Sequence, residues 1–141
     1  MRILLAVDGS VHSKRATTAL IRNSASYTRM PEVILLNVYY PVPDVNFGPL
    51  VSRKMVVSYY KEQADRALAA SRRLLDKAGI RYQAKVLVGP IAQTIVRQCR
   101  AMRCDLIFMG TRGMGGLGNM LLGSTATKVI HLAPVPVVLV K

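Results

Sequence analysis

Residues 109–125, MGTRGMGGLGNMLLGST, place a glycine-rich loop between the end of a predicted strand and the start of a predicted helix. The apolar run LIFM at 106–109 is typical of a strand inside a sheet, and the loop that follows holds six of the ten glycines in the chain. Glycines let main-chain N–H groups approach an anion closely, and the first amides of a helix have no partner within the helix. The stretch therefore predicts an anion site, and we interpret the anion as the phosphates of a nucleotide.

The rest of the chain alternates predicted strands with predicted helices. We expect strands over residues 2–7, 32–39, 81–88, 105–109 and 135–140. We expect helices over residues 10–27, 52–78, 90–102 and 124–131, with Ser10 as the first N-cap. The first two helices are expected to turn these residues toward the core: Ala16, Ala19, Leu20 and Asn23, then Val57, Tyr60, Ala64, Leu68, Ser71 and Leu75.

This alternation predicts an α/β fold in which helices cover both faces of a parallel sheet. Five strands and four helices indicate a flavodoxin-like, doubly wound open sheet of five parallel strands in the order 3-2-1-4-5. The length favours a single domain over residues 1–141. In this order the first and fourth strands are neighbours, so Asp8-Gly9-Ser10 and the glycine loop should meet at the carboxyl edge of the sheet.

Two common phosphate motifs do not fit the loop. Residues 113–118 form a literal G-x-G-x-x-G, but a dinucleotide fold also needs an acidic residue about twenty positions onward, and residues 125–141 contain no Asp or Glu. A P-loop needs a lysine directly after its last glycine, and the loop has none.

The spacing of Gly110, Gly113 and Gly123, followed by Ser124, resembles the G-2x-G-9x-G-(S/T) loop of the ATP-binding branch of the universal stress protein family. The resemblance covers essentially the whole chain, through ILLAVDGS at 3–10, VILLNV at 33–38, CDLIFMGTRG at 104–113 and APVPVVLV at 133–140. It implies the adenine-nucleotide-hydrolase-like form of the sheet and ATP as ligand, with or without Mg²⁺. It also implies a stress or signalling module that acts through a protein partner.

The resemblance implies two groups of ligand positions. Those near the nucleoside are Val7, Asp8, Val38, Met109 and Gly110. Those of the triphosphate cradle are Gly113, Gly123, Ser124 and Thr125. In one departure, Ala126 stands where some nucleotide-bound relatives have a hydroxyl.

Some of these residues also have simpler interpretations. Arg112 either pairs with a phosphate or is a solvated charge of the loop. Asp8 either faces the nucleoside or caps the first helix, and the glycines could serve only as turns.

The net charge of +13 attracts anions of any kind and does not separate ATP from nucleic acid. Nucleic-acid binding is the weakest alternative, because the chain has only two Phe, six Tyr and no Trp to stack on bases. Another alternative is a dimeric scaffold of the same fold that binds no nucleotide. No membrane-spanning run is present, Cys99 and Cys104 have no metal-like partner set, and we expect a cytoplasmic protein without a metal site.

Catalytic residues are not predicted. Asp8, Ser10 and His12 include triad residue types, but nearness in sequence is not triad geometry. No pair of acids has useful spacing for general acid–base catalysis. We therefore expect no enzyme activity beyond slow ATP hydrolysis.

The last predicted strand contains an apparent conflict. Residues 137–140 are apolar on both faces, yet the strand order and Pro136 both place this strand at an edge. A second copy pairing there would cover it, so we predict a homodimer through residues 135–140.

Overall fold

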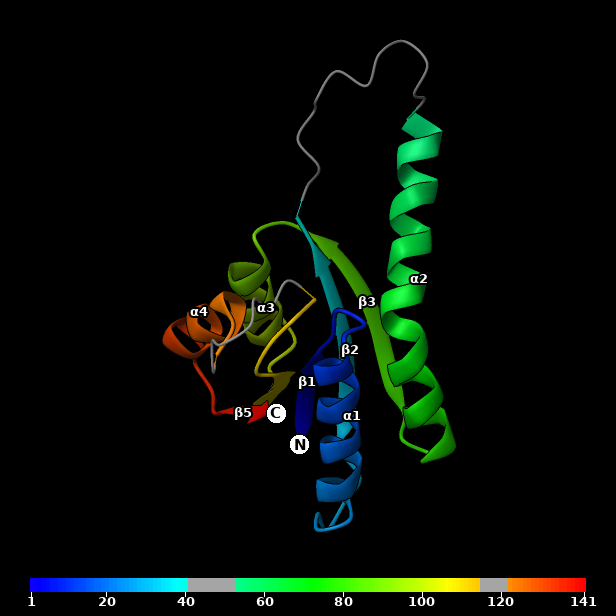
Figure 1. The fold of residues 1–141 in the computed structure, drawn as a ribbon. Coiled ribbons are helices and arrows are strands. Elements are labelled where there is room, and N and C mark those ends of the chain that lie inside the picture. Colours follow the sequence, from blue (N-terminus) through cyan, green and yellow to red (C-terminus); the bar gives the residue numbers. More distant parts are fainter. Residues whose placement is uncertain (41–52, 115–121) are drawn as a thin grey trace.

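The computed structural model describes residues 1–40, 53–114 and 122–141 (Figure 1). Five strands lie in this part of the chain: β1 (Arg2–Ala6), β2 (Glu32–Tyr39), β3 (Tyr82–Val88), β4 (Leu106–Gly110) and β5 (Val137–Val140). The helices are α1 (Val11–Ser24), α2 (Arg53–Lys77), α3 (Ile91–Ala101) and α4 (Ser124–Leu132). The predicted elements are all present, with ends that differ by a few residues.

The five strands are parallel and follow the order β3-β2-β1-β4-β5, which confirms the predicted topology. Ala6 of β1 pairs with Leu36 of β2 on one side and with Met109 of β4 on the other. This register brings the segments that follow β1 and β4 to the same edge of the sheet.

Two helical layers cover the sheet, α1 and α2 on one face and α3 and α4 on the other (Figure 1). Along β1, Ile3 and Leu5 point into the first layer, while Leu4 and Ala6 point into the second. Each fully buried aliphatic side chain of this kind contributes about 2 kcal/mol through removal from water. The central strands are apolar on both faces because both faces are covered.

The core-facing side of α1 differs from the expectation. Ser10 is the N-cap, as predicted, and its side chain accepts from the Ser13 N–H. However, the helix ends at Ser24, and Asn23 is exposed rather than packed. Thr17 is buried instead, because its hydroxyl shares a 2.8 Å hydrogen bond with Ser71 of α2.

The predicted stripe of α2 is correct only toward its carboxyl end. Leu68, Ser71 and Leu75 are buried, but the side chain of Val57 is 61% exposed. Figure 1 shows the first turns of α2 extending beyond the sheet, where no strand lies against them. β3 is an edge strand as predicted, and its Val86 and Val88 are exposed.

Two further sequence expectations concern β5 and the cysteines. β5 is an edge strand as predicted, but it begins at Val137 rather than at residue 135. Proline has no N–H to donate to a ladder, although the Pro136 carbonyl still accepts from Ile107. Cys99 and Cys104 are free and buried, and burial raises the pKa of the Cys104 thiol to about 12, so this thiol is not activated.

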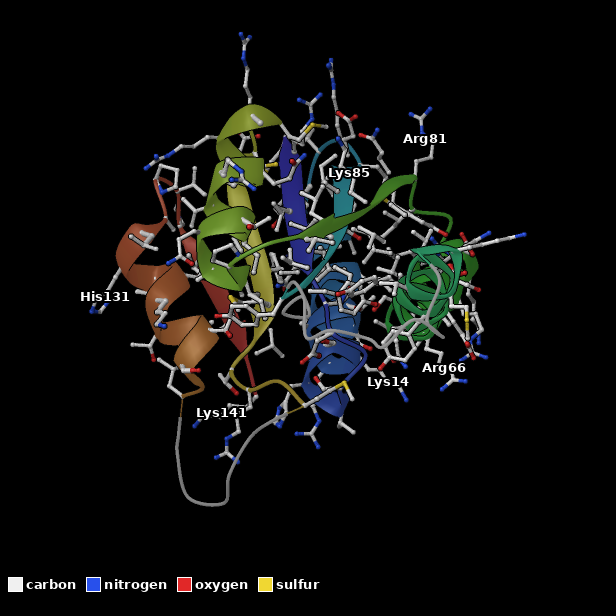
Figure 2. The ribbon with its side chains drawn as sticks, turned by 90° about the horizontal axis from the view of Figure 1, so that it is seen from above. Lys14, Arg66, Arg81, Lys85, His131 and Lys141 are labelled. Carbon is white, nitrogen blue, oxygen red and sulfur yellow. The ribbon has the colours of Figure 1, made fainter. Side chains whose placement is uncertain are left out.

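The positive charge is spread around the molecule. Figure 2 labels basic side chains on both helical layers and on both edges of the sheet: Lys14, Arg66, Arg81, Lys85, His131 and Lys141. In the part of the chain that the structure describes, no helix is long and apolar enough to cross a membrane.

Candidate functional site

The segments after β1 and β4 meet at the carboxyl edge of the sheet. The main-chain N–H of Met114, in the glycine loop, donates to Asp8 Oδ2 at 2.8 Å. The predicted convergence of the Asp8 turn with the glycine loop is therefore observed in the described part of the loop. Residues 115–121, which include most of the literal G-x-G-x-x-G motif, lie outside the described residues.

The Asp8 carboxylate is held by three protein donors. Its Oδ1 accepts from the Ser10 N–H at 3.0 Å and from the Ser13 hydroxyl at 2.6 Å, and Oδ2 accepts from Met114. Burial by itself raises the pKa of Asp8, but the hydrogen bonds from Ser13, Ser10 and Met114 outweigh burial and leave the pKa below its usual value. Asp8 is consequently ionised at neutral pH, and it joins the start of α1 to the glycine loop.

The glycine loop has two described arms, an incoming arm at residues 110–114 and an outgoing arm at residues 122–123. They are joined at a neck formed by Thr111 and Gly123. The Gly123 N–H donates to the Thr111 carbonyl at 2.7 Å, and the Thr111 N–H donates to the Val140 carbonyl at 2.9 Å. The second bond continues the pairing of β4 with β5. The mouth of the loop is thus a direct extension of the sheet.

Close packing explains two of the predicted glycines. A Cβ at Gly113 would lie 2.5 Å from Asp8 Oδ2. A Cβ at Gly110 would lie 2.7 Å from the Cβ of His12 and 2.9 Å from its carbonyl carbon. A side chain at Gly110 would meet the main chain of α1, so this glycine is required even without a ligand, whereas a side chain at Gly113 would displace the Asp8 carboxylate from its present position.

The first turn of α4 begins directly after the neck. Gly123 is its N-cap, and no side chain caps the helix there. The amides of Ser124, Thr125 and Ala126 donate to no acceptor among the described residues. The Ser124 side chain is exposed and Thr125 is half-buried. Unpaired amides at a positive helix end attract an anion.

An apolar surface lies on the α3/α4 side of this edge. Val38 of β2 and Met109 of β4 belong to the same buried cluster as Ala126 and the adjoining Leu122. The Ala126 methyl group is buried in that cluster, so only the main chain of this residue is available to an anion. The structure therefore brings Val38 and Met109 together, as the resemblance implies.

Val7 does not share that surface. Its side chain packs in the core under α1 and α2. Its N–H donates to the Leu36 carbonyl at 2.9 Å, and its carbonyl accepts from Asn37 Nδ2 at 2.7 Å. A ligand on the α3/α4 side would therefore meet neither the Val7 side chain nor a free Val7 N–H.

Arg112 lies on the incoming arm of the neck and is half-buried. Within the described ranges it forms no ion pair. His12 and Ser13 were not predicted as part of this site. The only sequence signal for Ser13 is its position three residues after the N-cap Ser10.

Comparison with known families gives one match over the full chain. The model of the universal stress protein family matches residues 1–141. A universal stress protein of Thermus aquaticus is 35% identical over 140 residues, which cover 99% of this chain and 97% of that protein. One from Methanocaldococcus jannaschii is 31% identical over 140 residues, covering 99% and 81%.

Solved structures share the fold. Universal stress protein UspA from Lactobacillus plantarum superposes with a TM-score of 0.81 at 20% identity, covering 100% of this chain and 97% of that one. The Archaeoglobus fulgidus protein in complex with dAMP has a TM-score of 0.66 at 21% identity, covering 100% and 98%. An Arabidopsis thaliana protein with AMP bound has a TM-score of 0.69 at 16% identity, covering 100% and 91%.

Proposed function

This chain belongs to the universal stress protein family, and on that premise we propose that it binds ATP at the carboxyl edge of its sheet. The observation that carries the proposal is the first turn of α4, which follows the neck of the glycine loop directly and whose leading amides donate to no acceptor among the described residues. Occupancy of this site would change which partner protein the chain binds, as in a signalling or stress-resistance module.

The surroundings favour an adenine nucleotide over a small anion such as phosphate. The apolar side chains of Val38 and Met109 belong to one cluster on the α3/α4 side of this edge, and an apolar surface of this kind suits a planar base. The amides of α4 and the charge of Arg112 lie next to the loop, where phosphates would bind. The relatives solved with dAMP and AMP support the same class of ligand.

Calorimetry on nucleotide-free protein tests this proposal. We expect saturable binding of ATP, one molecule per chain, in the presence of Mg²⁺. Mass spectrometry of nucleotide that co-purifies would show whether ATP, ADP or AMP is preferred. Absence of heat for all three at millimolar concentration would contradict the proposal and favour a scaffold that binds no nucleotide.

We propose that the protein is not an enzyme, apart from slow hydrolysis. The carboxylate that the described residues place at the site is Asp8, and its lowered pKa and three donors make it a weak general base. The described residues contain no group of three or more potential metal ligands. The cytoplasmic location remains a prediction.

We also propose that β5 pairs with β5 of a second copy. Its residues are half-buried and apolar, and its ladder in the described chain is with β4 alone. Light scattering is expected to give the mass of a dimer at micromolar concentration. Val140→Lys, at the last residue of β5, should weaken the dimer by about tenfold through a charge at the interface.

Val88→Lys is the matched control for the dimer, because Val88 is the last residue of the opposite edge strand, β3. It should leave the mass unchanged. A wild-type protein that scatters as a monomer, or two variants that weaken the dimer equally, would contradict pairing through β5.

A further inference from the structure

Ser13 connects α1 to the glycine loop through the carboxylate of Asp8. Its hydroxyl donates to Asp8 Oδ1 at 2.6 Å and accepts from the Asp8 N–H at 2.9 Å. The other carboxylate oxygen accepts from the Met114 N–H at 2.8 Å. Ser13 itself is buried, with 4% of its surface exposed, so no ligand reaches its hydroxyl directly.

These contacts fix both oxygens of the Asp8 carboxylate. The Ser13 hydroxyl and the Ser10 N–H hold one oxygen, which orients the other toward the loop. Gly113 lacks a Cβ at the position where one would lie 2.5 Å from that second oxygen, so the loop can approach it. We infer that Ser13 is a positioning residue for the nucleotide site, acting through Asp8 to hold the incoming arm of the glycine loop beside α4.

This inference rests on the proposed function, and it differs from the role that the family resemblance implies for Asp8. In that role the carboxylate faces the nucleoside. Here both of its oxygens are engaged by protein donors. Asp8 then acts on the ligand indirectly, by placing Gly113 and Met114 before the nucleotide arrives, which lowers the ordering cost of binding.

Ser13→Ala tests the inference, with Ser24→Ala as the matched control. Both serines lie on α1 with 4% exposure, but the Ser24 hydroxyl donates only to the Ile21 carbonyl at 2.6 Å. In nucleotide-free protein, hydrogen exchange of the Met114 amide should accelerate about tenfold in Ser13→Ala, because its charged acceptor is no longer oriented. The exchange rate should be unchanged in Ser24→Ala.

The titration of the Asp8 carboxyl, followed by NMR, provides a readout that simple destabilisation would not move. Loss of the Ser13 donor should raise the pKa of Asp8 toward or above its usual value, while Ser24→Ala leaves it lowered. His12 and Lys14 flank Ser13 on α1, Arg66 precedes Ala67, which lies against Gly9, and Arg112 stands two positions before Met114. In the described part of the chain none of them forms an ion pair with Asp8.

Calorimetry then decides whether the contact between Ser13 and Asp8 affects the affinity for ATP. ATP affinity should fall about tenfold in Ser13→Ala and remain unchanged in Ser24→Ala. If Met114 exchange and the Asp8 titration are the same in Ser13→Ala and wild type, the inference is overturned. An unchanged ATP affinity despite faster exchange also overturns it. A wild type that binds no ATP would instead remove the proposed function, while the exchange and titration would still decide whether Ser13 positions the loop.

Discussion

Gly123→Val is expected to abolish ATP binding while leaving the protein folded. Gly123 is the N-cap of α4, with φ −73° and ψ 153°, a conformation that valine adopts readily. Its Cβ would lie 3.3 Å from the Thr111 carbonyl oxygen and 3.4 Å from the Arg112 Cα. The γ-methyl groups would then fill the space between the neck and the first amides of α4, from which a phosphate must approach.

The expected loss of affinity is at least about 100-fold, which corresponds to about 3 kcal/mol. Calorimetry measures the affinity, and circular dichroism and light scattering check the fold and the oligomeric mass. Ser124→Ala is the matched control, because it removes the neighbouring hydroxyl but keeps every amide. It should cost about tenfold or less, the usual effect of one hydrogen bond. Wild-type affinity in Gly123→Val would show that the phosphates lie elsewhere.

Gly110→Ala is expected to lower the stability of the protein strongly, whether or not nucleotide is bound. The new Cβ would lie 2.7 Å from the Cβ of His12, 2.9 Å from its carbonyl carbon and 3.1 Å from the Arg112 carbonyl oxygen. Two of these three atoms are main chain, so a change of side-chain rotamer cannot relieve the clash. β4 or α1 has to move instead, and both pack against the same core.

Overpacking of this kind costs about 3 kcal/mol at the upper end of its usual range, and the melting temperature should fall by about 10 °C in a chain of this size. Thermal unfolding followed by circular dichroism measures the change. Gly79→Ala is the control, because nothing lies within 4 Å of its Cβ position and only its φ of +66° opposes a side chain. That substitution should cost about 1 kcal/mol. Equal melting temperatures for the two variants would refute the packing role of Gly110.

Most of the fold could be predicted from local patterns. The double-sided apolar runs at β1, β2 and β4 predicted central strands, and the alternation with helices predicted the parallel order. Val57 was predicted incorrectly because periodicity shows which face of a helix is apolar, but not how far the sheet extends beneath it. Asn23 was predicted incorrectly for a related reason, since Thr17 is buried through hydrogen bonds of its hydroxyl to Ser71 of α2 and to the Ser13 carbonyl, and the partner on α2 cannot be read from the pattern of α1.

The candidate site was predicted in outline rather than in its contacts. The glycine spacing and the hydroxyl at the helix start identified the loop, and the structure places Val38 and Met109 in the same buried cluster as Ala126 of the first turn of α4. The resemblance implies that Val7 lies near the nucleoside, and in the structure its side chain packs under α1 and α2. Val7 directly follows Ala6, and successive residues of an extended chain point to opposite faces, so Ala6 faces the side that carries Val38 and Val7 faces the other side.

The amino-acid sequence by itself determined the α/β class, the strand order, the edge position of β5 and the membership of the family, because the alternation of local strand and helix patterns along the chain and the motifs carried by single segments are enough to identify them. The tertiary structure alone decided what Asp8 and Gly110 contact. Asp8 meets Met114 across 106 positions of sequence, and Gly110 meets His12 of α1. Such contacts depend on the register between β1 and β4 and on the placement of α1, and both are set by packing of the whole core.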